Sequence, residues 1–274
     1  MTIESAYGDS ILVMLGALLL FLVLFLIYLL RSQSGKPGAQ AKRFNLRRIA
    51  GYEATTEGLS LSAETGRAVH ISPGTGGVGA QGIGTASTLA GMAGVESMAR
   101  VSAITGAPVQ ATTNDAIAYA LTDNAIRRGY RRAGWSLESE GGEVRFLTHA
   151  DPLAYVAGAA EVIDEQKVSS AVAVGSFGPE VLFLTEAHRR QGAHQIIGSS
   201  DPQALALMSI TADHSITGEE IFASGAYLDR RTTHTASLLA QDGLRWVLIL
   251  LIVVGFIVAN VFGIDWNSVL GIIP

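Results

Sequence analysis

Two long stretches without a charged residue, one near each end of the chain, restrict its architecture more than any other sequence feature. Ser10–Leu30 contains 21 residues dominated by Leu, Phe, Val and Ile, and Trp246–Ile264 contains 19. At 1.5 Å per residue, a helix of either length covers roughly 30 Å, which is the thickness of the hydrocarbon layer of a bilayer. The sequence therefore predicts one transmembrane helix over residues 10–30 and a second over residues 244–264.

A cleaved signal peptide is the competing interpretation of the first stretch. Signal peptides begin with basic residues and have a shorter apolar core, whereas this chain begins with Glu4 and Asp9, and Arg31 closes the apolar run. For the second stretch, the alternative is a buried helix of a soluble domain. The segment Val247–Val258 is apolar around its whole circumference, so a membrane environment fits it better.

The basic residues predict how the two helices are oriented. Every Lys and Arg lies within residues 31–245, and residues 1–9 and 265–274 contain none. Since positive residues are retained on the cytoplasmic side, we expect both termini outside the plasma or inner membrane and residues 44–243 in the cytoplasm. A basic linker, residues 31–43, would precede this domain, and the apolar tail 265–274 would lie in the outer interface.

Composition excludes several classes of site. The chain has no cysteine, so disulfides, cysteine zinc sites, iron–sulfur clusters and thiol catalysis are impossible within it. Its net charge is −5 and its pI is about 5.7, so no basic excess indicates a nucleic-acid partner. The six histidines are scattered without the spacing of a zinc motif, and the sequence predicts no metal site.

The middle of the chain alternates short β-rich runs with helical stretches, which is the pattern of an α/β domain. Helix starts are marked by Asp151-Pro152, by Asp201-Pro202, and by a cap at Asn114 or Asp115. This alternation favours parallel strands with right-handed crossovers, and hence a Rossmann-like, doubly wound, mostly parallel sheet. The strands are expected at Val69–Ser72, Pro108–Thr112, Val144–Thr148, Ser170–Gly175, His194–Gly198 and His214–Thr217.

Two further assignments depend on glycine and proline. Leu59–Ala63 and Ala68–Ser72 are strand-like runs on either side of Thr65-Gly66, which favours a small hairpin or the entry to a sheet. Val181–Arg190 is apolar enough for a strand. A Gly-Pro pair before it and a glycine after it favour a helix instead.

A glycine-rich segment, Pro73–Gly84, follows the first expected strand and precedes an expected helix. It contains G-x-G-x-x-G at Gly74, Gly76 and Gly79, and these glycines would let the backbone approach a phosphate at the N-terminus of the helix. A nucleotide or dinucleotide is therefore a candidate ligand. Two features count against it. The first acid after the next strand, Asp115, is about 40 residues from Gly74 where ~20 is usual, and no Lys-Ser or Lys-Thr completes a P-loop.

The same segment has a simpler interpretation as a flexible connection. It leads into Thr85–Thr105, an expected helix of small residues in which Gly91 and Gly94 would permit close backbone packing. Glu96 is the only charged residue among residues 71–99, so this helix is expected to be buried against the sheet, a neighbouring subunit or the membrane. This interpretation favours assembly over ligand binding.

Ligands of open parallel sheets bind beyond the carboxyl ends of the strands. In this region His149 and Asp151 are the candidate catalytic base and its partner, although no nucleophile stands at a recognisable spacing from them. Helix caps occupy the same positions in α/β folds, so capping is the favoured role for each Asp and Asn. The candidate ligand-binding residues are Gly74, Gly76, Gly79, Asn114, Asp115, Ser176, Ser199, Glu219 and Glu220.

Two segments resemble a known family. VGSFGPE (Val174–Glu180) and TGEEIFASGAYL (Thr217–Leu228) are similar to a family of uncharacterised prokaryotic membrane proteins that is defined as a domain of unknown function. The likeness extends over most of the domain, including its position between hydrophobic segments. It implies a membrane-tethered domain, and it supplies neither an activity nor a catalytic residue.

These observations rank three functional hypotheses. The first is a membrane-anchored cytoplasmic module for oligomeric assembly, scaffolding or sensing, whose partners are the lipid bilayer and a second copy or another membrane protein. The alternatives are a nucleotide- or dinucleotide-binding enzyme or sensor that uses residues 73–84, and a subunit of a transport or secretion assembly. The absence of catalytic spacing favours assembly over an enzyme.

Overall fold

The structure is a computed structural model that describes residues 3–33, 47–79, 83–135, 142–147, 151–229 and 232–262. The chain divides into two compact units. The helical unit contains Met1–Asn45 and Arg231–Pro274, and the α/β unit contains Leu46–Arg230. The predicted basic linker from residue 34 onward and the predicted tail 265–274 lie outside the described residues.

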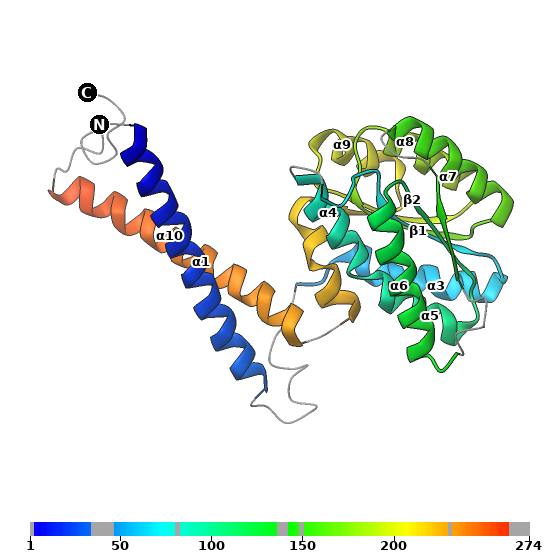
Figure 1. Cartoon of the computed structure of the whole chain (residues 1–274), viewed down its shortest axis with the longest axis horizontal. Helices are drawn as coiled ribbons and strands as arrows, with labels where there is room; N and C mark the ends of the chain where they lie inside the picture. Colours follow the sequence, from blue (N-terminus) through cyan, green and yellow to red (C-terminus); the bar gives the residue numbers. More distant parts are fainter. Residues whose placement is uncertain are drawn as a thin grey trace. The chain divides into compact units, whose positions relative to one another are not determined.

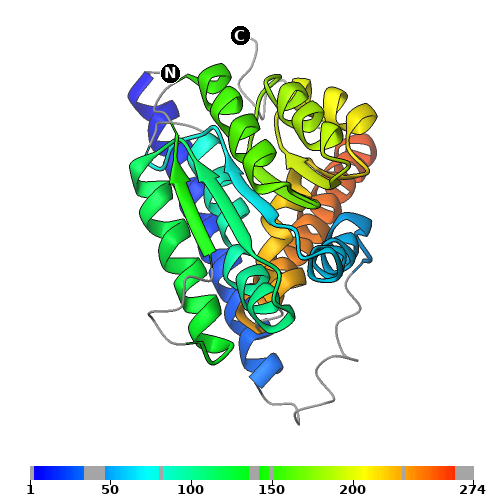
Figure 2. The ribbon, with the colours of Figure 1, turned by 90° about the vertical axis from the view of Figure 1, so that its right-hand side faces the viewer.

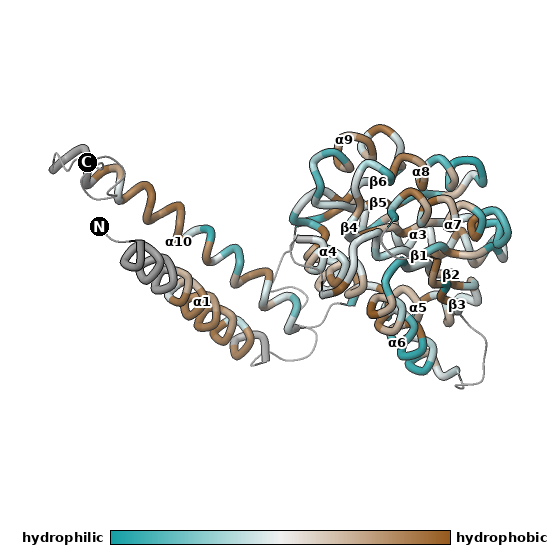
Figure 3. The backbone as a smooth tube through the Cα atoms, turned by 45° about the horizontal axis from the view of Figure 1, so that its top comes forward, coloured by the Kyte–Doolittle hydropathy of each residue, from teal (hydrophilic) through white to brown (hydrophobic). Residues whose placement is uncertain are grey.

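Two long helices form the described part of the helical unit. α1 (Ile3–Gln33) and α10 (Thr232–Phe262) pack against each other and run in opposite directions (Figure 1). A β-carbon at Gly243 of α10 would lie 3.5 Å from Leu24 Cδ1 and 3.6 Å from Tyr28 Cε2, which are ordinary contacts, so Gly243 faces α1. Figure 3 shows hydrophobic residues along α1 and along α10 after its middle.

The length and apolar surface of these helices show which of the two predicted transmembrane helices could cross a membrane. Within the described residues, Thr233–Ile257 of α10 is long and apolar enough to cross a membrane, and Met14–Leu30 of α1 is a shorter apolar stretch. Leu250, Leu251 and Ile252 of α10 are largely exposed within the chain itself. One candidate span is therefore present, while the second span, the outward orientation of both termini and the cytoplasmic location stay predictions.

A six-stranded sheet in which all neighbouring strands are parallel is the centre of the α/β unit. Its order is β3-β2-β1-β4-β5-β6, so the direction of winding reverses between β1 and β4, as in doubly wound sheets. The predicted α/β fold with a mostly parallel sheet is confirmed. All six strands predicted for the parallel sheet are present, with ends displaced by at most two residues: β1 (Val69–Gly74), β2 (Val109–Thr113), β3 (Gly142–Phe146), β4 (Ser170–Ser176), β5 (His194–Ser199) and β6 (His214–Thr217).

Helices cover both faces of the sheet, because strands of a parallel sheet are apolar on both sides. On one face α7, α8 and α9 (green to yellow in Figures 1 and 2) enclose the principal core, in which Tyr155, Leu184 and Met208 are fully buried. α3, α4, α5 and α6 cover the other face, where Gly51 of α3 lies against Ile216. The bounds are α3 (Ala50–Thr65), α4 (Ile83–Met92), α5 (Val95–Thr105), α6 (Ala116–Arg132), α7 (Pro152–Gln166), α8 (Val181–Arg190) and α9 (Pro202–Thr211). After β6 follow two short helical segments, η1 (Gly218–Ala223) and η2 (Gly225–Asp229).

Two predicted segments are wrong. Leu59–Ala63 is not a strand, because it lies inside α3, which continues to Thr65 and ends at Gly66 with a φ of 65°. Glycine is favoured both at a helix C-cap and in a hairpin turn, because each can require a positive φ. Thr65-Gly66 therefore indicates the end of a helix as readily as a hairpin. The predicted single helix Thr85–Thr105 is two helices, α4 and α5, that separate before Gly94, since its glycines weaken a continuous helix.

Aspartates start several helices, as the sequence predicts. Asp115, Asp151 and Asp201 each accept hydrogen bonds from the backbone N–H groups two and three positions further on. Asp115, and not Asn114, therefore caps α6. The prediction of a helix over Val181–Arg190 is also confirmed.

Candidate functional site

The described residues 73–79 of the glycine loop, Pro73–Gly84, lie at the carboxyl ends of β1 and β4, where the sheet reverses its winding, and residues 80–82 lie outside the described residues. Gly74 has a φ of 108°, which favours glycine, and its missing side chain lets the backbone of Ser176 come close. The N–H groups of Thr75 and Gly76 donate to Ser176 O at 2.7 and 3.3 Å. The end of β4 therefore fixes the start of the loop.

Two threonines of α4 hold the loop against the beginning of that helix. Thr88 Oγ1 donates to Gly76 O at 3.1 Å, and Thr85 Oγ1 donates to Gly77 O at 3.3 Å. Within the described residues, the N–H groups of Gly77 and Gly79 have no hydrogen-bond acceptor. Because the N-terminus of a helix carries partial positive charge, the N–H group of Gly77, whose carbonyl bonds to the first turn of α4, suits an anion.

The end of β2 brings further polar side chains to the loop. Asn114 is 4% exposed and its Nδ2 donates to Thr75 O, while Val78 N donates to Asp115 Oδ2 at 3.3 Å. Among the described residues, Asn114 Oδ1 and Thr113 Oγ1 are buried without a hydrogen-bond partner, and nothing donates to Asp115 Oδ1. The end of β2 thus offers unused oxygen atoms on two residues that bond to the glycine loop, Asn114 and Asp115.

Glu180 adds a second carboxylate on the β4 side of the loop. Its Oε1 accepts from Thr75 Oγ1 at 2.6 Å and from Gly178 N at 2.8 Å, and the residue is 7% exposed. In the part of the chain that the structure describes, no Lys or Arg side chain donates to the loop. The site therefore combines backbone N–H groups with the carboxylates of Asp115 and Glu180 and has negative local charge.

A buried hydrogen-bond chain reaches the loop from the principal core. Neighbouring polar atoms 2.6–2.9 Å apart connect His188, His70, Thr112, Tyr155 and Ser72. Ser72 Oγ then accepts from the N–H of Gly74 at 3.2 Å. Burial lowers the pKa of His70 to about 4 and raises that of Tyr155 to about 12, so both are uncharged at neutral pH. Burial, and then the neighbouring His70, also lower the pKa of His188. The chain links the core to the first residue of the loop without placing a charge there.

The remaining predicted site residues are not part of the glycine loop. Ser199 Oγ donates to a neighbouring backbone carbonyl at 2.7 Å, and Asp151 is an exposed helix cap. His149 lies outside the described residues, so its pairing with Asp151 stays a prediction. Glu219 and Glu220 follow β6, the edge strand three positions from β1.

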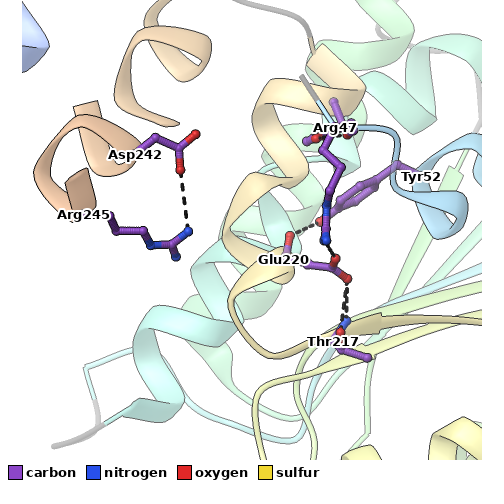
Figure 4. A network of polar contacts seen from close by, with 7 residues as sticks. Arg47, Tyr52, Thr217, Glu220, Asp242 and Arg245 are labelled. Atoms are coloured by element: carbon purple, nitrogen blue, oxygen red, sulfur yellow. Dashed lines mark hydrogen bonds and ion pairs between the residues drawn. The ribbon is translucent and has the colours of Figure 1, made fainter. Parts of the chain in front are cut away.

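Glu220 holds the first residues of the α/β unit in place. Its carboxylate forms an ion pair with Arg47 and accepts from Thr217 N at 3.1 Å and Thr217 Oγ1 at 3.2 Å (Figure 4). The Tyr52 hydroxyl donates to Glu220 O at 2.8 Å, and the Tyr52 ring stacks on Tyr227 with centroids 5.2 Å apart. Burial raises the pKa of Tyr52, so it remains a neutral donor. Glu220 therefore has a structural role in joining this segment to the end of β6.

Comparison with known proteins assigns the chain to a family. The family model for a domain of unknown function, DUF6754, matches residues 7–270. The chain belongs to this family. The match covers α10 and nearly all of α1, so DUF6754 includes both units, and the predicted resemblance to a domain of unknown function is confirmed. No curated protein and no solved structure matches the chain.

Two residues at the DUF6754 glycine loop were missed by the sequence analysis: Thr75 and Glu180. Glu180 stands beyond β4, after a Gly-Pro pair, at the same kind of position that marked Asn114 and Asp115. Its place after the strand was therefore a usable signal, whereas Thr75 inside the loop had none.

Proposed function

We propose that this DUF6754 protein is a membrane-tethered domain that binds a nucleotide or dinucleotide at the glycine loop. The phosphate would lie against the N–H groups of Gly77 and Gly79 at the start of α4, and the nucleoside would extend over the end of β2. The position of the loop supports the proposal, because doubly wound sheets bind ligands where their winding reverses.

One observation carries the proposal: unused polar atoms at the end of β2. A buried polar atom without a partner costs about 1–3 kcal/mol, and such atoms are uncommon unless a ligand or water completes them. Asn114 Oδ1 is of this kind, and the Asn114 amide bonds to the loop at Thr75. A ligand with a hydroxyl or amino group would complete it.

One of the observations behind oligomeric assembly, the first hypothesis from the sequence, has another explanation. The small residues of α4 and α5 have partners inside the α/β unit: Gly91 lies on the backbone of Val174, and Gly94 lies against Leu228. This close packing requires no second copy. Assembly with other chains and a role in transport or secretion stay predictions.

The nucleotide proposal predicts that a ligand stabilises the full-length protein in detergent. A suitable panel contains AMP, ADP, ATP, NAD+ and FAD. A ligand at 100 times its dissociation constant raises the free energy of unfolding by about 2.7 kcal/mol. Gly77→Ala is expected to abolish this thermal shift without changing the Tm of the free protein. Gly77 has no positive φ, and its new β-carbon would make an ordinary contact 3.5 Å from Asp115 Oδ1 while filling the ligand's space.

Gly158→Ala in α7 is the matched control for that experiment. Its β-carbon would lie 3.5 Å from Leu147 Cδ1, again an ordinary contact, but the position is outside the glycine loop. The control should keep the full shift. A wild-type protein that no member of the panel stabilises, or a Gly77→Ala protein that responds like wild type, would contradict the proposed site.

The tether predicts a specific topology, with both termini outside and the α/β unit in the cytoplasm. Because the chain has no cysteine, single cysteines can be introduced without background. In intact cells, a membrane-impermeant maleimide should label Ser5→Cys and Ser268→Cys, while Ser60→Cys, exposed on α3, should react only after permeabilisation. Labelling of Ser60→Cys in intact cells would reverse the proposed orientation.

A further inference from the structure

α6 exposes large apolar side chains and arginines on the surface of the α/β unit. Ile117, Tyr119 and Leu121 lie in its first half and are 38–52% exposed. Its only acidic residue, Asp123, is half-buried and pairs with Arg127 at 2.8 Å. The exposed residues of α6, a helix that the structure describes throughout, therefore include no acid. Its second half carries four exposed arginines: Arg127, Arg128, Arg131 and Arg132.

α5 supports this surface and extends it. Arg128 Nε donates to Glu96 Oε2 of α5 at 2.9 Å, and Arg132 pairs with the same carboxylate. Glu96 is buried, so these contacts hold both guanidinium groups against α5. One and two turns after Glu96 stand Arg100 and Ile104, both exposed, and residues four positions apart share one side of a helix. The two helices thus form one basic and apolar surface, the α5–α6 surface.

The rest of the α/β unit has the opposite charge. Leu46–Arg230 contains 13 basic and 20 acidic residues, whereas α5 and α6 together contain five arginines and two carboxylates. The exposed charged residues of α7, by contrast, are all acidic: Glu161, Asp164 and Glu165. Positive charge is therefore concentrated on one surface of a unit that is otherwise acidic.

From this distribution we infer that the α5–α6 surface lies against anionic lipid headgroups of the membrane that anchors the chain. Anionic leaflets attract arginines close to their surface, and the exposed apolar side chains of a basic helix bury between headgroups and acyl chains. A nucleic acid would pair with the arginines but would leave Ile117 and Leu121 in water.

The tether makes this contact easier to form. A surface on an anchored chain stays close to the bilayer, so its effective concentration there is high and a modest intrinsic affinity suffices. The inference goes beyond nucleotide binding and rests only on the tether of the proposed function.

A fluorophore on α6 reports the contact in the full-length protein. The chain has no cysteine, so Leu121→Cys can be labelled specifically with an environment-sensitive nitrobenzoxadiazole group. Its emission should be about twofold brighter in nanodiscs that contain phosphatidylglycerol than in nanodiscs of phosphatidylcholine alone. High salt should remove this difference, because it screens exposed charges. The double variant Arg127→Gln/Arg131→Gln should remove most of it as well.

Arg189→Gln/Arg190→Gln is the matched control for the charge change. These exposed arginines also end a helix, and Arg190 also pairs with an acid four positions before it, Glu186. The control should keep the full difference between the two lipids. A label on Leu153→Cys, an exposed apolar position of α7, should show no difference.

Three results would overturn the inference alone: equal emission of the Leu121→Cys label in the two lipids, a difference that survives Arg127→Gln/Arg131→Gln, or an equal difference at Leu153→Cys. A protein that does not enter nanodiscs would overturn the tether together with the inference. Nucleotide binding at the glycine loop is independent of all these outcomes, because its thermal shift is measured in detergent.

Discussion

Replacing Gly91 with alanine should destabilise the α/β unit severely. Gly91 lies where α4 crosses the end of β4, and a β-carbon there would overlap Val174 O and lie 3.2 Å from Gly175 Cα. Both atoms belong to the backbone, so a side chain cannot rotate away and the helix or the strand must shift. Overpacking costs about 1–3 kcal/mol and occasionally more, and we expect about 3 kcal/mol here. That is a large part of a typical stability of roughly 5–15 kcal/mol.

Gly84→Ala in the same helix is the control for this prediction. Its β-carbon would lie 3.5 Å from Ser176 Oγ, an ordinary contact, and alanine is favoured over glycine in a helix by up to about 1 kcal/mol. Hydrogen exchange of the β1 and β4 peptides in the full-length protein reports the opening free energy of the unit for both variants. If both variants were equally stable, α4 would not lie directly on β4, and the start of α4 at the glycine loop would not be fixed by that contact.

The sequence predicted those elements whose signals are local. Asp151-Pro152 and Asp201-Pro202 start helices because the aspartate accepts from N–H groups only two and three positions away, and the proline fits the first turn. The strands between such helices then follow from their apolar runs. Gly66 shows the limit of a local signal, since the same left-handed residue that would close a hairpin ends α3.

Strand order is not a local property, and the site depends on it. The separation of about 40 residues between Gly74 and Asp115 argued against a dinucleotide site. In the structure, the crossover from β1 to β2 contains two helices, α4 and α5, in place of one, and Asp115 still lies at the end of the strand next to β1. The spacing rule assumes one helix, so a separation of about 40 residues does not by itself place Asp115 away from the loop.

The sheet edge also explains why the predicted site residues do not all lie at the glycine loop. Every strand of a parallel sheet ends at the same edge, so the rule selected Ser199 and Glu220 as readily as Asn114 and Ser176. Among the predicted site residues that the structure describes, those at the ends of β1, β2 and β4 contact the described part of the glycine loop. Ser199 bonds to backbone beyond its own strand, and Glu220 caps a helical segment after the outermost strand. Separating these cases requires the order of the strands, which no short motif specifies.

The buried pair His70 and His188 makes the unit sensitive to acid. In an unfolded chain an imidazole has a pKa near 6.5, whereas burial lowers the pKa of His70 to about 4 in the folded protein. Between these values the unfolded chain binds a proton that the folded protein does not, so lowering the pH favours unfolding. For His70 alone, the free energy of unfolding falls by nearly ~1.4 kcal/mol per pH unit below pH 6.5. At pH 4 it has fallen by about 3 kcal/mol. His188 adds to it, since its pKa is also lowered.

Urea unfolding of the full-length protein in detergent, followed by circular dichroism from pH 7 to pH 4, should therefore show a steep loss of stability on acidification. The double variant His70→Gln/His188→Gln should be less stable at pH 7, because it disrupts the chain to Thr112, but it should lose less stability as the pH falls. His214→Gln is the control, because His214 is partly exposed and should keep the wild-type slope. If protonation of the buried pair causes the loss, the free energies of unfolding of the wild type and of the double variant should converge as the pH falls. Parallel curves would mean that other groups set the acid sensitivity.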